Sequence, residues 1–113
     1  MNPFRRNIST LRKSYKIAAW TISNVGMVIA VSLLSMEAII INVLGAIIGS
    51  VTSAYLAYYA IRIGSHQEML TKCIDPRKES LVNPVEFVNM GLLEVVFSVG
   101  FLALGVALAF KAT

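Results

Sequence analysis

Reactive side chains are scarce in this chain of 113 residues, and their scarcity excludes several kinds of function. There is one cysteine, Cys73, and one histidine, His66, so the chain can form no internal disulfide and no cysteine–histidine metal cage. The sequence also has no nucleophile–base pair and no phosphate-binding glycine loop. We therefore predict that the protein is not an enzyme, has no catalytic residues and needs no metal or cofactor, although a bound lipid is compatible with it.

Charge is scarce as well, and long hydrophobic runs take its place. Charged residues make up 14% of the chain and hydrophobic residues 57%, whereas about a quarter of an ordinary soluble domain is charged. Residues 17–61 carry a single charge, that of Glu37. As one helix this run would be about 68 Å long, roughly twice the thickness of a bilayer's hydrocarbon core. We therefore predict two transmembrane helices, at 17–35 and 39–61. One long broken helix is the alternative, because no glycine or proline marks the turn.

Residues 84–110 form a third hydrophobic segment with a clear beginning. Asn83 suits the cap position before a helix, Pro84 suits the first helical position, and Glu86 stands where a capping-box acid belongs. A helix of this length measures about 40 Å and crosses a bilayer with some tilt. The sequence thus predicts an all-α integral membrane protein with three transmembrane helices, folded as a single unit over residues 1–113.

The segment before the first predicted span, residues 3–16, has the pattern of an amphipathic helix. Four apolar residues recur at steps of four, three and four and share one helical face: Phe4, Ile8, Leu11 and Tyr15. With cations around it, such a helix lies in the headgroup layer of a membrane. The same basic, acid-free segment also has features of a mitochondrial presequence and of a signal peptide. We favour a short permanent interfacial helix that precedes the three spans.

Nine of the ten lysine and arginine residues fall in two clusters. The first lies before or at the start of the first span and comprises Arg5, Arg6, Arg12, Lys13 and Lys16. The second lies in the loop predicted at 62–83 and comprises Arg62, Lys72, Arg77 and Lys78. Three spans put both clusters on one face, at the lipid headgroups, and the positive-inside rule assigns that face to the cytoplasmic or matrix side. This distribution explains the net charge of +4 without nucleic acid and predicts the inner membrane of a bacterium or a mitochondrion.

Small residues recur every three or four positions in two of the predicted spans. They are Gly45, Gly49, Ser53 and Ala57 in the second span and Gly100, Ala103 and Ala107 in the third. Such rows let helix backbones approach closely, which is how helices associate when the surrounding lipid is as apolar as their side chains. They predict helix packing, but the partner can be another span, another copy or a different subunit. Two polar residues inside the spans, Asn24 and Asn42, are expected to hydrogen-bond to neighbouring helices.

One carboxylate, Glu94, stands inside the third span. A central acid in a membrane helix costs about 2.5–3.5 kcal/mol on insertion scales, less if it is protonated or paired. Two interpretations stay open. A neutral Glu94 can be hydrogen-bonded to Asn42, Ser98 or a neighbouring subunit, or its carboxyl group can bind and release a proton or another ion, which requires an apolar site.

The end of the chain, residues 74–113, resembles the second half of the c subunits of F-type ATP synthases. Pro76, in the loop, precedes Glu94 by 18 residues. The string Met90-Gly91-Leu92-Leu93-Glu94 is similar to the sequence that leads into the family's ion-binding acid. The resemblance implies a ring of hairpins in which Glu94 would carry protons or sodium. This chain departs from the family pattern in its loop, Ile74-Asp75-Pro76, and in its additional basic N-terminal span.

Taken together, these patterns predict a small non-catalytic integral membrane subunit of a larger complex, most simply a bioenergetic one. Its expected partners are membrane lipids and other membrane subunits or copies of itself. A c-like subunit that translocates protons or sodium is one alternative. A conjugative pilin-like helical hairpin, which would form a homopolymer around a basic inner loop, is another.

Overall fold

The computed structural model describes residues 9–112. In these residues the chain is helical apart from short connections and one isolated β-bridge. The elements are α2 (Lys13–Leu34), α3 (Ile39–Ser65), α4 (Gln67–Cys73), the 3-10 helix η1 (Pro76–Leu81) and α5 (Pro84–Ala112).

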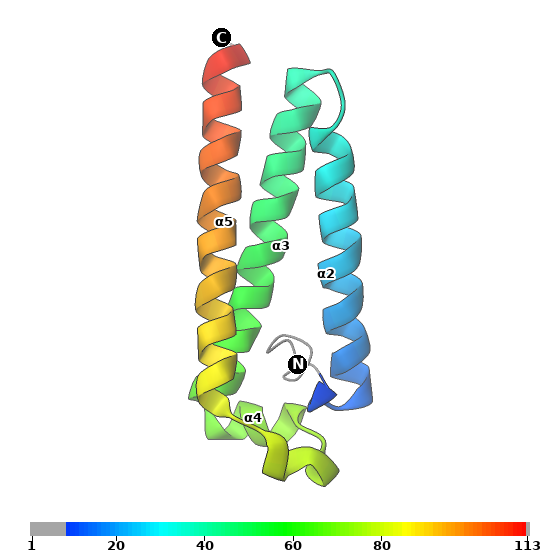
Figure 1. The fold of residues 1–113 in the computed structure, drawn as a ribbon, viewed down its shortest axis with the longest axis vertical. Helices are drawn as coiled ribbons and strands as arrows, with labels where there is room; N and C mark the ends of the chain where they lie inside the picture. The colour runs from blue at the N-terminus through cyan, green and yellow to red at the C-terminus, as the bar shows by residue number, and fades with distance from the viewer. Residues whose placement is uncertain (1–8, 113) are drawn as a thin grey trace.

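Three long helices lie side by side in an elongated bundle that measures 53 × 24 × 21 Å (Figure 1). The central helix is α3, which packs against α2 on one side and α5 on the other. Each neighbouring pair is antiparallel. The short elements α4 and η1 therefore lie at the same end as the beginnings of α2 and α5, and the C-terminus lies at the opposite end.

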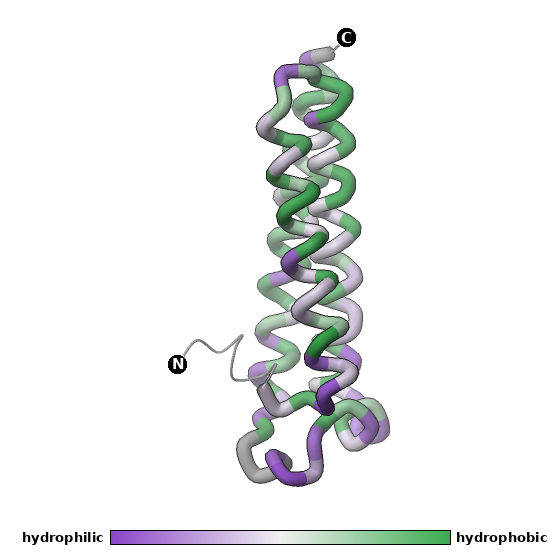
Figure 2. Tube along the Cα trace, turned by 90° about the vertical axis from the view of Figure 1, so that its right-hand side faces the viewer, coloured by the Kyte–Doolittle hydropathy of each residue, from purple (hydrophilic) through white to green (hydrophobic). Residues whose placement is uncertain are grey.

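The three long helices are each long and apolar enough to cross a membrane. Their most apolar windows have mean hydropathies of 1.9, 1.9 and 2.3 for α2, α3 and α5. Large apolar side chains lie on the outside of the bundle, among them Val28, Ile40 and Val96, which are 64%, 74% and 64% exposed. Figure 2 shows hydrophobic residues along the bundle and hydrophilic ones gathered mainly at the end that holds α4 and η1. An apolar exterior of this extent indicates a membrane-embedded protein, so the prediction of an all-α fold with three such helices is confirmed.

The separate interfacial helix expected at 3–16 is not shown. Residues 1–8 lie outside the described part of the chain, and the last four residues of the expected helix form the first turn of α2. Between them Arg12 is extended, with φ −60° and ψ 152°. Leu11 is 6% exposed and forms a β-bridge with Ile74, so it packs against the protein where the pattern suggested a lipid-facing position.

The reversal between α2 and α3 occupies residues 35–38 and is held by the side chain of Asn42. Its Nδ2 donates hydrogen bonds to the carbonyl oxygens of Leu33, Leu34 and Met36, at 2.9, 3.2 and 2.8 Å. The last carbonyl groups of a helix have no partner within it, so this amide satisfies the end of α2. That contact lets two membrane-length helices reverse without glycine or proline, and the alternative of one long broken helix is wrong.

The segment expected as a basic loop, 62–83, is largely helical. Helix α3 continues to Ser65, and α4 and η1 follow before α5 begins at Pro84. As the cap pattern predicts, Asn83 Oδ1 accepts a hydrogen bond from the backbone N–H of Val85 at 3.1 Å. This end of the molecule therefore has an ordered surface on which its cations are placed.

Candidate functional site

The row of small residues on α3 is buried between its two neighbours. Gly45 faces α2, where an added Cβ atom would lie 2.9 Å from the carbonyl oxygen of Ala30. Gly49 faces α5, where an added Cβ would lie 2.7 Å from the ring of Phe101. Ser53 and Ala57 are buried as well, with 0% and 2% exposure. One row of small residues on α3 thus serves two helix contacts.

On α5 the glycines that contact α3 are not the ones that the spacing singled out. At Gly91 an added Cβ would meet the side chain of Ile61 and would lie 3.1 Å from the carbonyl oxygen of Ala57. At Gly105 it would lie 3.3 Å from the Cβ of Ala46. Both glycines are buried. They belong to a row with alternating steps of four and three residues, at positions 87, 91, 94, 98, 101 and 105, which is the spacing of helices that pack along their length.

The other small residues of α5 point away from α3. Gly100, Ala103 and Ala107 are exposed, and no atom lies within 4 Å of the position that a Cβ at Gly100 would occupy. At 100° per residue they lie on the side of α5 opposite the row that contains Gly91. We call this the outer face of α5. Among residues 9–112 it has no helix partner.

A pair of serines links α3 and α5 near the middle of the bundle. Ser98 Oγ donates a hydrogen bond to the carbonyl oxygen of Ser50 at 2.9 Å, and the two hydroxyl groups lie 3.1 Å apart. Two of the partners expected for Glu94 are therefore engaged elsewhere, Ser98 with Ser50 and Asn42 with the end of α2. Asn24, also expected to hydrogen-bond to a neighbouring helix, is exposed on α2.

Glu94 lies on the α3-facing side of α5, ten residues after Pro84 and so about 15 Å along the helix. It faces Ser53 of α3. Glu94 Oε2 and Ser53 Oγ are both buried, and neither has a hydrogen-bond partner of good geometry among the described residues. In an apolar setting an unpartnered polar atom costs free energy, so this pair is a place where a proton, a water molecule or an ion would be stabilised.

A small apolar cavity adjoins the carboxyl group. Its volume is about 60 Å³, and the residues that line it with Glu94 are Leu11, Ala19, Leu56, Tyr59, Ala60, Ile63, Phe87 and Met90. A buried water needs roughly 10–15 Å³ of such space, so the cavity has room for one or a few waters. No cluster of three or more metal-ligating side chains occurs in residues 9–112. The site therefore places the Glu94 carboxyl group against the Ser53 hydroxyl group, beside a cavity whose other lining residues are apolar except for Tyr59.

Backbone hydrogen bonds join the start of α2 to the segment after α4. Arg12 N–H donates to Cys73 O at 2.8 Å, and Asp75 N–H donates to Thr10 O at 2.9 Å. Beneath this junction lies an apolar cluster of Leu11, Ile63, Cys73, Ile74 and Phe87. The junction brings together two segments that are far apart in the sequence, and with them the two basic clusters.

Seven of the nine cations of those clusters belong to the described residues and lie at this end: Arg12, Lys13, Lys16, Arg62, Lys72, Arg77 and Lys78. The remaining two, Arg5 and Arg6, lie outside the described residues. Arg62 donates a hydrogen bond to Tyr58 Oη at 2.6 Å, and its guanidinium carbon lies 5.4 Å from the centre of the Tyr58 ring. Such a pair suits the boundary between lipid and water.

Two ionisable groups at the junction have shifted pKa values. The pKa of Asp75 is lowered, first by the hydrogen bond that the backbone N–H of Arg77 donates to Oδ1 at 3.0 Å and also by the nearby Arg77 guanidinium. Burial raises the pKa of the Cys73 thiol, which is 1% exposed. At neutral pH Asp75 is therefore a carboxylate and Cys73 is a neutral thiol.

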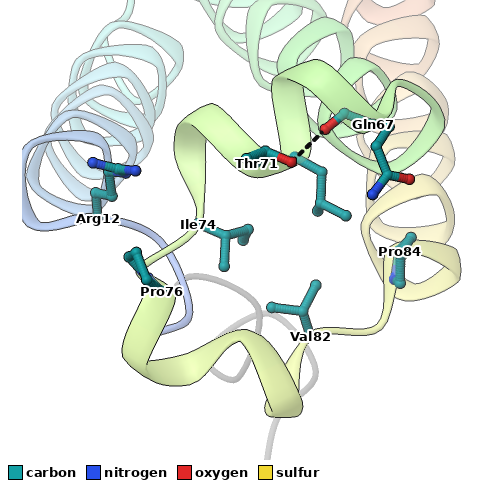
Figure 3. A pocket seen from close by; sticks show the side chains of 8 residues that line it. Arg12, Gln67, Thr71, Ile74, Pro76, Val82 and Pro84 are labelled. Atoms are coloured by element: carbon teal, nitrogen blue, oxygen red, sulfur yellow. Dashed lines mark hydrogen bonds between the residues drawn. The ribbon is translucent and has the colours of Figure 1, made fainter.

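Two cavities open at this end of the bundle. The first, about 350 Å³, lies between α4, η1 and the start of α5 and is lined by Arg12, Gln67, Leu70, Thr71, Ile74, Pro76, Val82 and Pro84 (Figure 3). Few of its side chains are polar. The Thr71 hydroxyl group already donates a hydrogen bond to the carbonyl oxygen of Gln67 at 2.9 Å. The second, about 590 Å³, is more basic and is lined by Leu11, Lys13, Lys16, Ile17, Asp75, Arg77 and Lys78. We call the second one the basic cavity.

Comparison with protein-family models, with curated proteins and with solved structures found no match. The function is therefore proposed from the geometry of the chain itself.

Proposed function

We propose that the protein is a small, non-catalytic integral membrane subunit that works within a larger assembly, and that the outer face of α5 docks another transmembrane helix. The observation that carries this proposal is the exposure of Gly100, Ala103 and Ala107. The small residues that α5 needs for its contact with α3, Gly91 and Gly105, lie on the opposite side. The small residues of the outer face therefore take no part in the packing of α5 against α3.

A helix partner is the occupant that this face fits best. In lipid, apolar surface alone gives no driving force for association, because the acyl chains are as apolar as the side chains. Small residues gain van der Waals contact only when a backbone comes close, so a row of them favours another helix over lipid tails. On the other two membrane-length helices the exposed surface carries larger side chains, such as Val28 on α2 and Val51 on α3.

The orientation in the membrane belongs to the same proposal. Seven cations lie at the end that holds α4 and η1, and Lys111 lies near the other end. By the positive-inside rule we assign the basic end to the cytoplasmic or matrix side of a bacterial or mitochondrial inner membrane. A bioenergetic complex is the assembly that we propose for it.

The test is isolation of the tagged full-length protein from native membranes in a mild detergent. We expect other membrane chains to be isolated with it, and we expect Gly100→Leu/Ala107→Leu to lose them. The matched control, Val99→Leu/Val106→Leu, enlarges neighbouring residues at similar depths on another side of α5 and should keep them. A wild-type protein that is isolated alone, or equal losses in both variants, would contradict the proposal.

A second candidate function, translocation of protons or sodium, is favoured by Glu94. Its Oε2 is buried without a partner beside a cavity of about 60 Å³, which suits a group that gains and loses a proton or another ion. The resemblance of residues 74–113 to the c subunits of F-type ATP synthases favours the same role. In that case the assembly would be a ring of identical copies, and a pilin-like homopolymer would likewise contain one kind of chain.

Two measurements separate these candidates. The ratio of chains in the isolated assembly distinguishes an accessory subunit, with one copy among dissimilar chains, from a ring or filament of identical copies. For Glu94, ion flux into vesicles should be lost in Glu94→Gln and retained in part in Glu94→Asp if the carboxyl group carries ions. Unchanged flux in Glu94→Gln rejects translocation and leaves the accessory role.

A further inference from the structure

We propose that the basic cavity binds the phosphate-bearing headgroup of an anionic phospholipid. The cavity has a volume of about 590 Å³, and its walls come from Leu11 and the start of α2 and from Asp75 and the start of η1. This inference concerns lipid recognition at the basic end of the molecule. It does not depend on which protein partner, if any, contacts α5.

The charge of the cavity suits a phosphate group. Among the side chains that the structure describes, Lys13, Lys16, Arg77 and Lys78 line it as cations, against the carboxylate of Asp75. That carboxylate is already engaged, because it accepts a hydrogen bond from the backbone of Arg77 and lies 3.5 Å from the Arg77 guanidinium. Lysine and arginine are the side chains that bind phosphate most strongly, through charge-assisted hydrogen bonds.

The beginning of α2 adds to the attraction. Its cap residue, Arg12, makes no side-chain cap hydrogen bond, and its first turn contains no acidic residue. The positive end of the helix dipole is therefore not compensated within α2, and two of its first residues, Lys13 and Lys16, line the cavity. The helix end supports the site, although the four cations and the cavity define it.

The position of the cavity favours a lipid over a soluble phosphate. Ile17 lines the cavity one turn into α2 and is 55% exposed. The apolar surface of the helix begins at this residue. A headgroup held by Lys13 and Lys16 would place its acyl chains along this apolar surface. A soluble phosphate would gain nothing from the apolar wall.

The two walls are held in place before any ligand arrives. The backbone bonds between Arg12 and Cys73 and between Asp75 and Thr10 fix the segments against each other. Lys78 Nζ also donates to the carbonyl oxygen of Ser9 at 2.8 Å, so this side chain crosses from η1 to the N-terminal segment. A preorganised site loses less conformational entropy on binding.

The test uses the full-length protein in detergent micelles, with bound lipid counted by native mass spectrometry. Phosphatidylglycerol is titrated against phosphatidylcholine, and inorganic phosphate is added as a competitor in a separate arm. We expect the wild-type protein to retain phosphatidylglycerol preferentially, and Lys13→Gln/Lys16→Gln to lower that affinity about tenfold or more, since each hydrogen bond from a cation to the phosphate contributes about a factor of ten.

The matched control is Arg12→Gln/Lys72→Gln, which removes two cations at the same end of the bundle but outside the basic cavity. It should change the affinity by less than about twofold, because its cations do not line the site and so donate no hydrogen bond to the phosphate. Circular dichroism of both variants checks that the helices are retained. Equal losses in the two variants, or no preference for phosphatidylglycerol, would overturn the proposal. Displacement of the lipid by equimolar inorganic phosphate would assign the cavity to a soluble phosphate and overturn it too.

Discussion

Both sides of α5 carry small residues, but the surroundings of these residues differ. On the side toward α3, Gly91 and Gly105 are buried, and at Gly91 a single added carbon would meet neighbouring atoms. On the outer face, Gly100, Ala103 and Ala107 are exposed, with open space around Gly100. The comparison teaches that a small residue in a membrane helix marks a close contact only when the structure supplies the neighbour. Where it does not, we propose that the neighbour is a helix of another chain.

The sharpest way to break this comparison is to enlarge one glycine on each side. Gly91→Leu forces a side chain into Ile61 and the backbone at Ala57, and overpacking of this kind costs about 1–3 kcal/mol. Gly100→Leu meets no neighbour among the described residues and should not lower the free energy of unfolding; the loss of a glycine from a helix should raise it by up to about 1 kcal/mol. Denaturation of the full chain in micelles, followed by circular dichroism, measures both. Equal destabilisation would show that the two sides do not differ.

Two asparagines extend the comparison to the other helix pair. Asn42 donates to three carbonyl groups at the end of α2, whereas Asn24 is exposed on the surface of that helix. Asn42→Ala should lower the free energy of unfolding by about 1–2 kcal/mol, because the carbonyl groups of Leu34 and Met36 lose this hydrogen bond, whereas that of Leu33 still accepts one from a backbone N–H. Asn24→Ala should have an effect of less than about 0.5 kcal/mol. If Asn24→Ala proves the more damaging change, the assignment of Asn42 as the residue that holds the reversal is wrong.

The serine pair tests whether polar contacts inside the bundle contribute individually. A double-mutant cycle over Ser50→Ala and Ser98→Ala should give a coupling energy of about 0.6 kcal/mol, the average for such bonds between membrane helices. The same cycle over Ser50→Ala and Ser32→Ala, with Ser32 exposed on α2, provides the control and should give no coupling. Coupling in the control pair alone would mean that the bond between Ser50 and Ser98 does not form.

The smallest expected effect concerns Cys73, a buried residue outside the long helices. Since burial raises the pKa of its thiol, the unfolded chain loses this proton first, at the ordinary value of 9.0. The contribution of Cys73 to stability is therefore complete below pH 9 and falls as the pH rises above it. Denaturation of the wild type and of Cys73→Ala at pH 7 to 10 isolates this contribution. A difference between them that grows in favour of the wild type above pH 9 would contradict the assignment.

The sequence predicts the three long helices because hydrophobic length is a property of each segment by itself. The cap at Asn83 is local as well, and the structure shows it. Two features have no local signal. The first is the bridge between Leu11 and Ile74, which joins segments far apart in the chain. Because no pattern within residues 3–16 indicates this contact, their amphipathic spacing suggested a helix in the headgroup layer.

The second of these features is the side of α5 that contacts α3. Its row alternates glycines with large or polar residues, including Phe87 and Phe101, so it does not read as a row of small residues. Spacing alone favoured Gly100, Ala103 and Ala107. Only the positions of Ile61 and Ala57 reveal that Gly91 is the close contact, since those neighbours come from another helix.

The most direct test of the proposed docking face compares two adjacent positions at one depth in the membrane. In a Cys73→Ala background, Ala107→Cys and Val106→Cys are each labelled with benzophenone maleimide in native membranes and irradiated. The docking proposal predicts a crosslink to another polypeptide chain from position 107 and little or none from position 106. Equal yields from both positions, or attachment to lipid alone at position 107, would contradict it.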